Sequence, residues 1–115
     1  MNADPDCIFC KIVAGQIPAK KVFEDEELLV FHDIHPWAPV HVLVVPKVHI
    51  ASLAEAGPEH EALLGRMLGL APRLMRQLGV ENGFRTVINT GRDGGQEVAH
   101  LHMHVLGGPR PWLRG

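Results

Sequence analysis

The sequence predicts an α+β fold in which a five-stranded antiparallel sheet packs against one main helix and a short N-terminal helix. Five short segments are rich in the β-branched and aromatic residues that strands favour. In one longer segment, apolar residues recur at positions 63, 64, 67, 68, 71, 74, 75 and 78, which is the period of a helix with one buried stripe. The connections between consecutive strand segments are mostly short, and short connections favour antiparallel pairing.

Turn and cap residues set the expected bounds of these elements. The short helix is expected over residues 7–14 and ends at Gly15, since glycine is a common helix cap. The main helix is expected over residues 58–80, with Pro58 at its start and Gly79 near its end. Pro72 lies inside it and predicts a kink or a break, because proline removes a backbone donor. Strands are expected at residues 21–24, 28–32, 40–45, 84–89 and about 99–106.

Length and composition narrow the class of protein. A chain of 115 residues with 46% hydrophobic and 21% charged residues is typical of a single globular domain, here residues 1–115. The net charge of -2, with no long run of one sign, argues against a general nucleic-acid binder but leaves a small anionic ligand open. No apolar stretch is long enough to cross a bilayer, and residues 1–6 do not resemble a secretory signal. A cytoplasmic protein with no membrane partner is therefore expected.

Three histidines alternate with apolar residues near the C-terminus. His100, His102 and His104 are separated by Leu101 and Met103, so in a strand the three imidazoles share one face and stand about 6.6 Å apart. Two functions fit this pattern. Two such rings can chelate zinc, or a neutral imidazole, with a reference pKa of about 6.5, can act as a nucleophile.

A glycine-rich loop precedes the histidines, with the sequence GRDGGQ over residues 91–96. Glycines let backbone N–H groups approach an anion closely, so the loop could form a phosphate nest. The same sequence, with Asp93 followed by Gly94, is also typical of a plain hairpin turn. Both interpretations are compatible.

Two cysteines are separated by two residues, Cys7 and Cys10. Two thiolates at this spacing can fill half of a tetrahedral zinc site, and this interpretation is favoured over two buried free thiols. A thioredoxin-type redox role is disfavoured, because the order of elements lacks a βαβ unit.

Several blocks of this sequence, in order, resemble the histidine triad superfamily and its nucleotide-binding branch. The blocks are residues 7–18 (CIFCKIVAGQIP), 31–34 (FHDI), 41–50 (HVLVVPKVHI) and 89–108, which include the triad and the following Gly107-Gly108. The resemblance implies a HIT-like fold paired as a homodimer. It also implies an enzyme that hydrolyses the P–N bond of purine nucleoside 5′-phosphoramidates through a covalent nucleotidyl-histidine.

The resemblance also implies a role for individual residues. His102 would be the nucleophile, His104 would contact the phosphate and help to protonate the departing amine, and His41 and His100 would complete the catalytic group. Asp33 would bind the ribose hydroxyls, as a carboxylate can for a cis-diol. The implied substrate-binding residues are Asp33, Ile34, Asn89, Gly95, Gln96, Val98 and His104. A structural zinc, not needed for catalysis, would be held by Cys7, Cys10, His49 and His100.

Two features depart from the family pattern. Glu97 stands where some members carry a serine that touches the phosphate, and a carboxylate there would repel it. The C-terminal tail, residues 109–115, is short and contains Trp112, whose role is open. The alternatives are a dinucleoside polyphosphate hydrolase or nucleotidyl transferase of the same superfamily, and a nucleotide- or zinc-binding regulatory module with little turnover.

Overall fold

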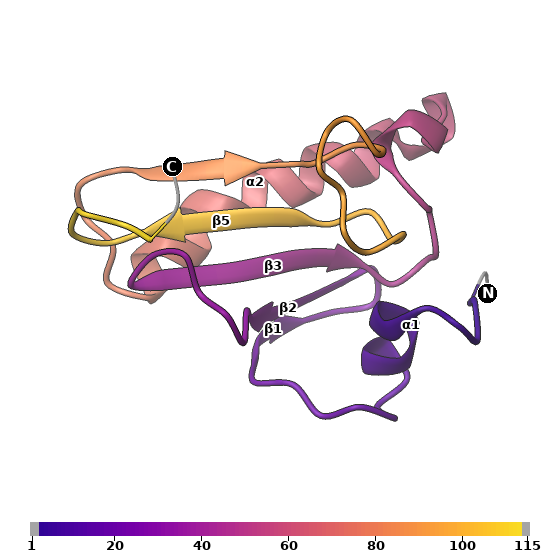
Figure 1. Cartoon of the computed structure of the whole chain (residues 1–115), viewed down its shortest axis with the longest axis horizontal. Coiled ribbons are helices and arrows are strands. Elements are labelled where there is room, and N and C mark those ends of the chain that lie inside the picture. The colour runs from indigo at the N-terminus through magenta and orange to yellow at the C-terminus, as the bar shows by residue number, and fades with distance from the viewer. Residues whose placement is uncertain (1–2, 114–115) are drawn as a thin grey trace.

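A five-stranded antiparallel sheet forms the centre of the computed structural model, which describes residues 3–113 (Figure 1). The strand order is β1-β2-β3-β5-β4, so β3 and β5 lie inside the sheet and β1 and β4 at its edges. This confirms the predicted α+β fold. The strands are β1 (Lys21–Glu24), β2 (Leu28–His32), β3 (Val40–Pro46), β4 (Phe84–Val87) and β5 (Met103–Gly107).

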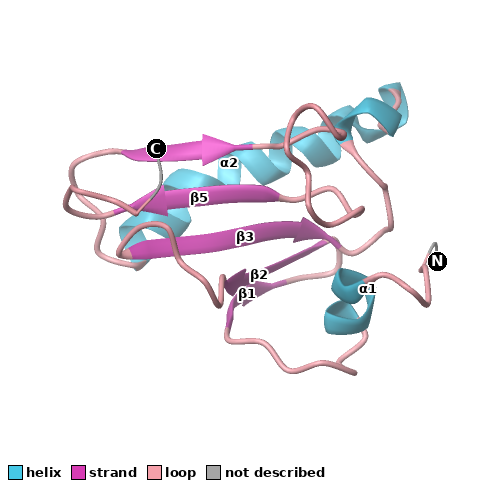
Figure 2. Ribbon diagram, viewed as in Figure 1, coloured by secondary structure: helices cyan, strands magenta, loops and turns pink. Residues whose placement is uncertain are grey.

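Two α-helices accompany the sheet, and α2 runs along one of its faces (Figure 2). They are α1 (Ile8–Val13) and α2 (Glu61–Gln77), and two short 3-10 turns, η1 (Leu53–Glu55) and η2 (Pro58–His60), precede α2. In residues 3–113, neither helix has the length and apolar character needed to span a membrane.

The N-terminal helix forms as the sequence predicts. Cys7 is its N-cap, and the Cys7 sulfur accepts a hydrogen bond from the Cys10 backbone N–H at 3.3 Å. Gly15 follows with a φ of 79°, a left-handed conformation that favours glycine and closes the helix. The cap therefore brings the two cysteine side chains to the same end of α1.

The main helix is not split at Pro72, so of the two predicted outcomes, a kink or a break, the break was wrong. It is one α-helix from Glu61 to Gln77, preceded by a 3-10 turn that begins at Pro58. Proline deprives the carbonyl four residues earlier, that of Leu68, of its helical donor. Leu68 is 54% exposed, so water can reach that part of the helix and replace the lost bond. Gly79, with a φ of 80°, ends the helix as expected.

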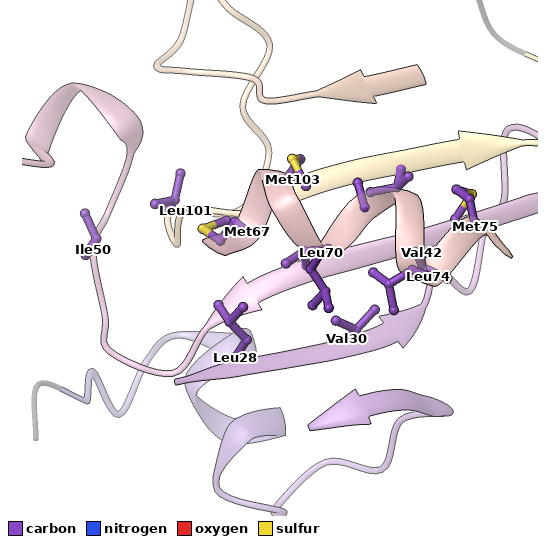
Figure 3. Packing of buried hydrophobic residues seen from close by; sticks show 13 residues of the cluster. Leu28, Val30, Val42, Ile50, Met67, Leu70, Leu74, Met75, Leu101 and Met103 are labelled. Atoms are coloured by element: carbon purple, nitrogen blue, oxygen red, sulfur yellow. The ribbon is translucent and has the colours of Figure 1, made fainter. Parts of the chain in front are cut away.

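The two faces of the sheet are covered differently. Figure 3 shows the face that packs on α2, where Val42 and Met103 belong to the same apolar cluster as the helix residues Leu70 and Leu74. The opposite face carries a second apolar cluster, in which Phe9 and Ile12 of α1 pack on residues of β2 and β3. Since side chains alternate along a strand, every second residue of β3 and β5 faces away from α2.

The last strand begins at Met103 rather than near residue 99, and β4 ends at Val87 rather than at residue 89. In the observed register Val44 lies opposite Met103, so two residues further along Leu101 would lie opposite Pro46. Proline has no N–H to donate to the ladder, so pairing with β3 stops there. The Leu101 N–H instead donates to the Ile50 carbonyl at 2.7 Å. The alternation nevertheless persists, because Leu101 packs in the same cluster as Met103 and Val105.

An ion-pair network ties α2 to the turn between β1 and β2. Arg66 donates to Asp25 and to Glu27, each at 2.7 Å. The Arg66 hydrogen bond is the largest cause that lowers the pKa of Asp25 from its ordinary value of 3.8 to about 2. A carboxyl group whose pKa is depressed by folding stabilises the fold above its unfolded pKa, and this contribution is lost as the pH falls through about 2.

We expect Arg66→Met to lower the urea midpoint at pH 7 and to have progressively less effect as the pH falls toward 2. The reason is that protonated Asp25 no longer gains from the guanidinium. The measurement is urea unfolding of both proteins at several pH values between 7 and 2. Arg73→Met, which removes an exposed arginine of the same helix, serves as the control. If the urea midpoint of the Arg66 variant stayed below that of the wild type by the same amount at every pH, the assigned role of the Arg66–Asp25 pair would be contradicted.

Candidate active site and metal centre

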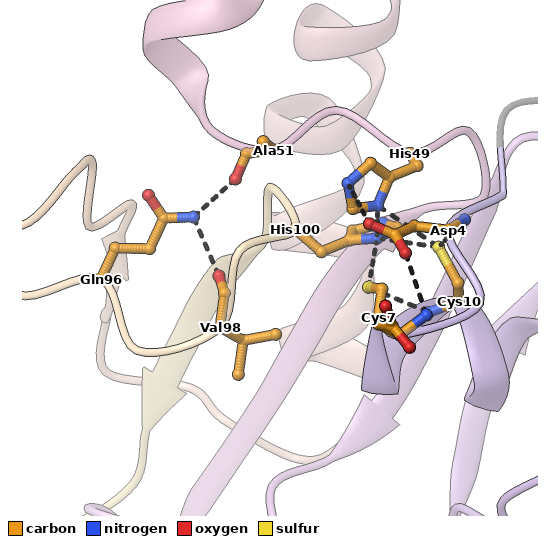
Figure 4. A network of polar contacts seen from close by, with 9 residues as sticks. Asp4, Cys7, Cys10, His49, Ala51, Gln96, Val98 and His100 are labelled. Atoms are coloured by element: carbon orange, nitrogen blue, oxygen red, sulfur yellow. Dashed lines mark hydrogen bonds and ion pairs between the residues drawn. The ribbon is translucent and has the colours of Figure 1, made fainter.

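Two cysteines and two histidines meet at one end of the sheet (Figure 4). Cys7 and Cys10 come from the start of α1, His49 follows β3, and His100 precedes β5. One potential ligand atom from each residue lies within 4.8 Å of the others. The structure therefore brings together all four residues that the resemblance implies for zinc.

The distances in this cluster suit a tetrahedral ion. The Cys7 and Cys10 sulfurs lie 3.3 Å and 3.6 Å from Nδ1 of His100, and the Cys10 sulfur lies 3.3 Å from Nδ1 of His49. The two Nδ1 atoms are 3.1 Å apart. With ordinary zinc bond lengths, a tetrahedron has sulfur-to-nitrogen edges of about 3.5 Å and a nitrogen-to-nitrogen edge of about 3.3 Å. The donor set and its spacing fit zinc.

The surroundings prepare these side chains to be ligands. Nε2 of His100 donates to the Pro46 carbonyl at 2.8 Å, which leaves the Nδ1 lone pair directed at the cluster. Burial lowers the pKa of His100 and raises that of the Cys7 thiol, so without a cation the neutral forms are favoured. A bound cation reverses this for sulfur, because it stabilises the thiolate. Asp4 adds an outer contact, with Oδ2 at 3.9 Å from Nε2 of His49.

His102 is oriented by the backbone of the same cluster. Its Nδ1 donates to the His100 carbonyl at 2.7 Å, so the neutral ring keeps its lone pair on Nε2. Phe9 meets the His102 ring edge to face, with centroids 5.0 Å apart. Burial lowers the pKa of His102, and the neutral imidazole is therefore the main form at pH 7. A buried, neutral imidazole with a defined lone pair has the properties of a nucleophile.

A second pair of histidines stands beside His102. Nδ1 of His41 accepts a hydrogen bond from the Trp37 backbone N–H at 3.1 Å, so the neutral His41 ring carries its proton on Nε2. That Nε2 is 2.8 Å from Nδ1 of His104, to which it donates. His104 in turn carries its own proton on Nε2, and its ring centroid lies 5.1 Å from that of His102. The arrangement offers one ring as a nucleophile and its neighbour as a donor.

Asp33 links this pair to an open cavity. Its Oδ2 lies 3.5 Å from Nε2 of His41, and its Oδ1 accepts from the His35 backbone N–H at 2.8 Å. The cavity has a volume of about 670 Å³, and Ile34 beside it is 85% exposed. The residues around the cavity are Pro18, Ala19, Lys20, His32, Asp33 and Ile34.

The glycine-rich loop is closed by its own hydrogen bonds. The Gly91 N–H donates to the Gln96 side-chain oxygen, and the Gln96 N–H donates to the Gly91 carbonyl. The Gly95 N–H donates to the Arg92 carbonyl. Because these three donors are used within the loop, the phosphate nest stays a prediction. Gly94 is required sterically, since a Cβ there would lie 2.2 Å from the Thr90 carbonyl oxygen.

Two amide side chains hold this loop in place. Asn89 donates to the Gly94 carbonyl at 2.8 Å. Gln96 reaches out of the loop and donates to the carbonyls of Ala51 and Val98, at 2.7 Å and 2.9 Å (Figure 4). The Val98 carbonyl also accepts from the His100 N–H at 2.8 Å. Gln96 therefore connects the loop to the segment that carries His100.

Some residues differ from expectation or were not anticipated from sequence. Leu43 belongs to the apolar cluster under α1, and Glu97 is exposed. Sequence reasoning missed Asp4 and Trp37. The available signal for Trp37 was an aromatic residue in the proline-rich segment four positions before His41.

The geometry predicts the tautomer of His102. A long-range ¹H–¹⁵N spectrum at pH 8 should show a protonated Nδ1 and an unprotonated Nε2 for this residue, because Nδ1 donates to the His100 carbonyl. Loss of these signals in His102→Gln would assign them. A proton on Nε2 instead would contradict the orientation described above.

Comparison with known proteins agrees with the fold and with the motif blocks. The profile of the HIT domain matches residues 14–110. Protein HitA of Neisseria gonorrhoeae is 55% identical over 104 residues, which cover 90% of this chain and 97% of that protein. Purine nucleoside phosphoramidase of Escherichia coli K12 is 44% identical over 104 residues, covering 90% and 87% of the two chains.

Solved structures show the same similarity. A HIT family hydrolase from Legionella pneumophila superposes with a TM-score of 0.88 at 46% identity, covering 91% of this chain and 95% of that one. A Zn-bound histidine triad family protein from Mycobacterium smegmatis superposes with a TM-score of 0.78 at 36% identity, covering 89% and 74%. Sequence, motif order and fold agree, and the chain belongs to the HIT domain family.

Proposed function

We propose that this HIT family enzyme hydrolyses the P–N bond of purine nucleoside 5′-phosphoramidates, such as conjugates of AMP with an amine. The observation that carries the proposal is the His102 ring, whose Nδ1 donates to the His100 carbonyl at 2.7 Å and whose lone pair is therefore on Nε2. The similarity to the E. coli purine nucleoside phosphoramidase supports the substrate class.

The proposed reaction has two steps. In the first, Nε2 of His102 attacks the α-phosphorus, a P–N bond to His102 forms, and the bond to the substrate amine breaks. The amine takes up a proton as it leaves, because an amine anion is a very poor leaving group. In the second step water attacks the same phosphorus and gives a proton to the group that protonated the amine. The bond to His102 breaks, and the nucleoside monophosphate is released with His102 restored.

His104, His41 and Asp33 act around the reacting phosphate in this proposal. His104 carries its proton on Nε2, so it can donate to a phosphate oxygen and assist the departing amine. His41 holds the His104 ring from the other side through the 2.8 Å hydrogen bond. In this proposal Asp33, which lies 3.5 Å from His41 at the edge of the 670 Å³ cavity, binds the ribose hydroxyls, and the exposed Ile34 contacts the base.

The glycine-rich loop is the proposed contact for the phosphate end of the substrate. Asn89 and Gln96 keep it folded beside His100, and Gly95 and Val98 lie on the same stretch of chain. Glu97 is exposed, so its carboxylate can turn toward water when the phosphate binds.

Zinc bound by Cys7, Cys10, His49 and His100 is the second part of the proposal, supported by the distances in the cluster and by the Zn-bound relative. Four protein ligands leave the ion no open coordination position, so it would be structural and would cross-link the N-terminal helix to the sheet. The cluster residue His100 also carries the carbonyl that orients His102.

A homodimer is the proposed assembly. The edge strand β4 has one paired side, and its residue Phe84 is 42% exposed. Pairing of a second copy at such an edge would satisfy open backbone groups and cover apolar surface. The molar mass from light scattering tests this directly, and a monomer at micromolar concentration would contradict it.

The catalytic proposal predicts a covalent adduct. Mixing wild-type protein with a fluorogenic adenosine phosphoramidate and quenching early should give a protein carrying one adenylyl group on His102. His102→Ala should show no adduct and lose turnover by at least about 1,000-fold, the scale seen when a nucleophile is removed. Mass spectrometry of the quenched protein and fluorescence of the released amine are the two readouts.

His60→Ala is the matched control, because His60 lies outside both histidine clusters and bonds to the Gly57 N–H. AMP binding without an adduct and without turnover in the wild type would favour the binding-module alternative. Faster cleavage of a dinucleoside polyphosphate than of the phosphoramidate would favour the alternative hydrolase.

The metal proposal predicts close to one zinc per chain after purification in the absence of chelators. Cys10→Ser should lose most of this zinc and unfold at a lower temperature, because three ligands bind the ion less tightly than four. Elemental analysis and thermal unfolding are the measurements. Full zinc content in Cys10→Ser would show that the ion binds elsewhere.

A further inference from the structure

Trp37 lies against the second pair of histidines from the loop between β2 and β3. Its ring stacks on the His104 imidazole, with centroids 4.6 Å apart and an interplanar angle of 21°. The same indole also lies beside the His41 ring, with ring centroids 4.8 Å apart and an interplanar angle of 52°. One aromatic side chain therefore contacts both rings of the hydrogen-bonded pair.

The backbone of Trp37 acts on the same pair. Its N–H donates to Nδ1 of His41, and this bond places the His41 proton on Nε2, from which it is donated to His104. The residue thus defines the tautomer of one ring through its main chain and the plane of the other through its side chain.

The surroundings of Trp37 do not resemble those of an ordinary core aromatic. The residue is half-buried and is part of neither apolar cluster in residues 3–113. Its outer side borders a hollow of about 370 Å³ shared with the C-terminal segment, where the Leu113 N–H donates to the Trp37 carbonyl at 2.7 Å. Trp37 therefore contacts the histidine pair through its ring and the C-terminal segment through its main chain.

We infer that Trp37 is a positioning residue, whose indole holds the plane of the His104 ring so that Nε2–H points at the substrate. This inference rests on the proposed function for its catalytic consequence. The aromatic face favours a stacked imidazole, and an aliphatic side chain of similar reach offers no such face. A misplacement of about 1 Å in a catalytic group can lower the rate about 100-fold.

The test compares Trp37→Leu with Trp37→Phe. Both keep the backbone N–H to His41, so only the side chain changes. We expect Trp37→Leu to lower kcat for the fluorogenic adenosine phosphoramidate by about 10- to 100-fold with KM changed by less than about 3-fold, since His104 is misplaced rather than the nucleotide. Trp37→Phe should recover most of kcat. Leu68→Ala, at an exposed site on α2, is the control for surface substitution.

An NMR measurement detects the stacking of Trp37 on His104 and does not require enzyme turnover. The ring protons of His104 should be shifted upfield by the indole, should keep much of that shift in Trp37→Phe, and should lose it in Trp37→Leu. Three outcomes would overturn the inference. Trp37→Leu could fold and keep the wild-type kcat, or it could change KM alone. Both variants could also lose the same share of kcat while the His104 signals stay unchanged. Absence of turnover in the wild type would instead overturn the proposed function, while the NMR comparison would still decide whether Trp37 positions His104.

Discussion

The hydrogen bond from Nδ1 of His102 to the His100 carbonyl is the interaction on which the site depends. It sets the lone pair of His102 on Nε2, and it does so with a backbone atom that belongs to a residue of the cysteine and histidine cluster. The position of that carbonyl depends in turn on the His100 ring, which is fully buried and bonded to the Pro46 carbonyl. His100 therefore connects the N-terminal helix and the end of β3 with His102.

The division of the sheet into two faces makes this possible. Side chains that face α2 form the main apolar core, which needs no polar partner and gives the sheet its rigidity. The other face carries His41 and His104 on neighbouring inner strands, where both rings are buried within a few ångströms of each other. Inner strands are held by hydrogen bonds on both sides, so functional groups on them are positioned more rigidly than groups on a loop. The loop residues Asp33 and Trp37 then complete the site from outside the sheet.

Burial determines the chemical state of these groups as much as contact does. Removal from water lowers the pKa of His102 and of His100, and the result in each case is a neutral ring with a lone pair. In His102 this lone pair suits attack on phosphorus, whereas in His100 it is directed at two sulfurs. The same physical effect thus acts on the proposed nucleophile and on a proposed metal ligand two residues away, and the two rings differ in which nitrogen the neighbouring carbonyl engages.

The fold class, the approximate elements and the histidine, cysteine and aspartate residues of the candidate site could be predicted from sequence, because strand alternation, helix caps and motif spacing are local properties. Alternation placed Leu101 and Met103 in the core and the histidines opposite, and capping predicted the turn at Gly15. Local patterns did not reveal the early end of strand pairing at Pro46, the continuity of α2 through Pro72, or the stacking of Trp37 on His104. These features emerge only in the folded chain, because each depends on the contacts that a distant segment or the solvent makes with a backbone group or a ring.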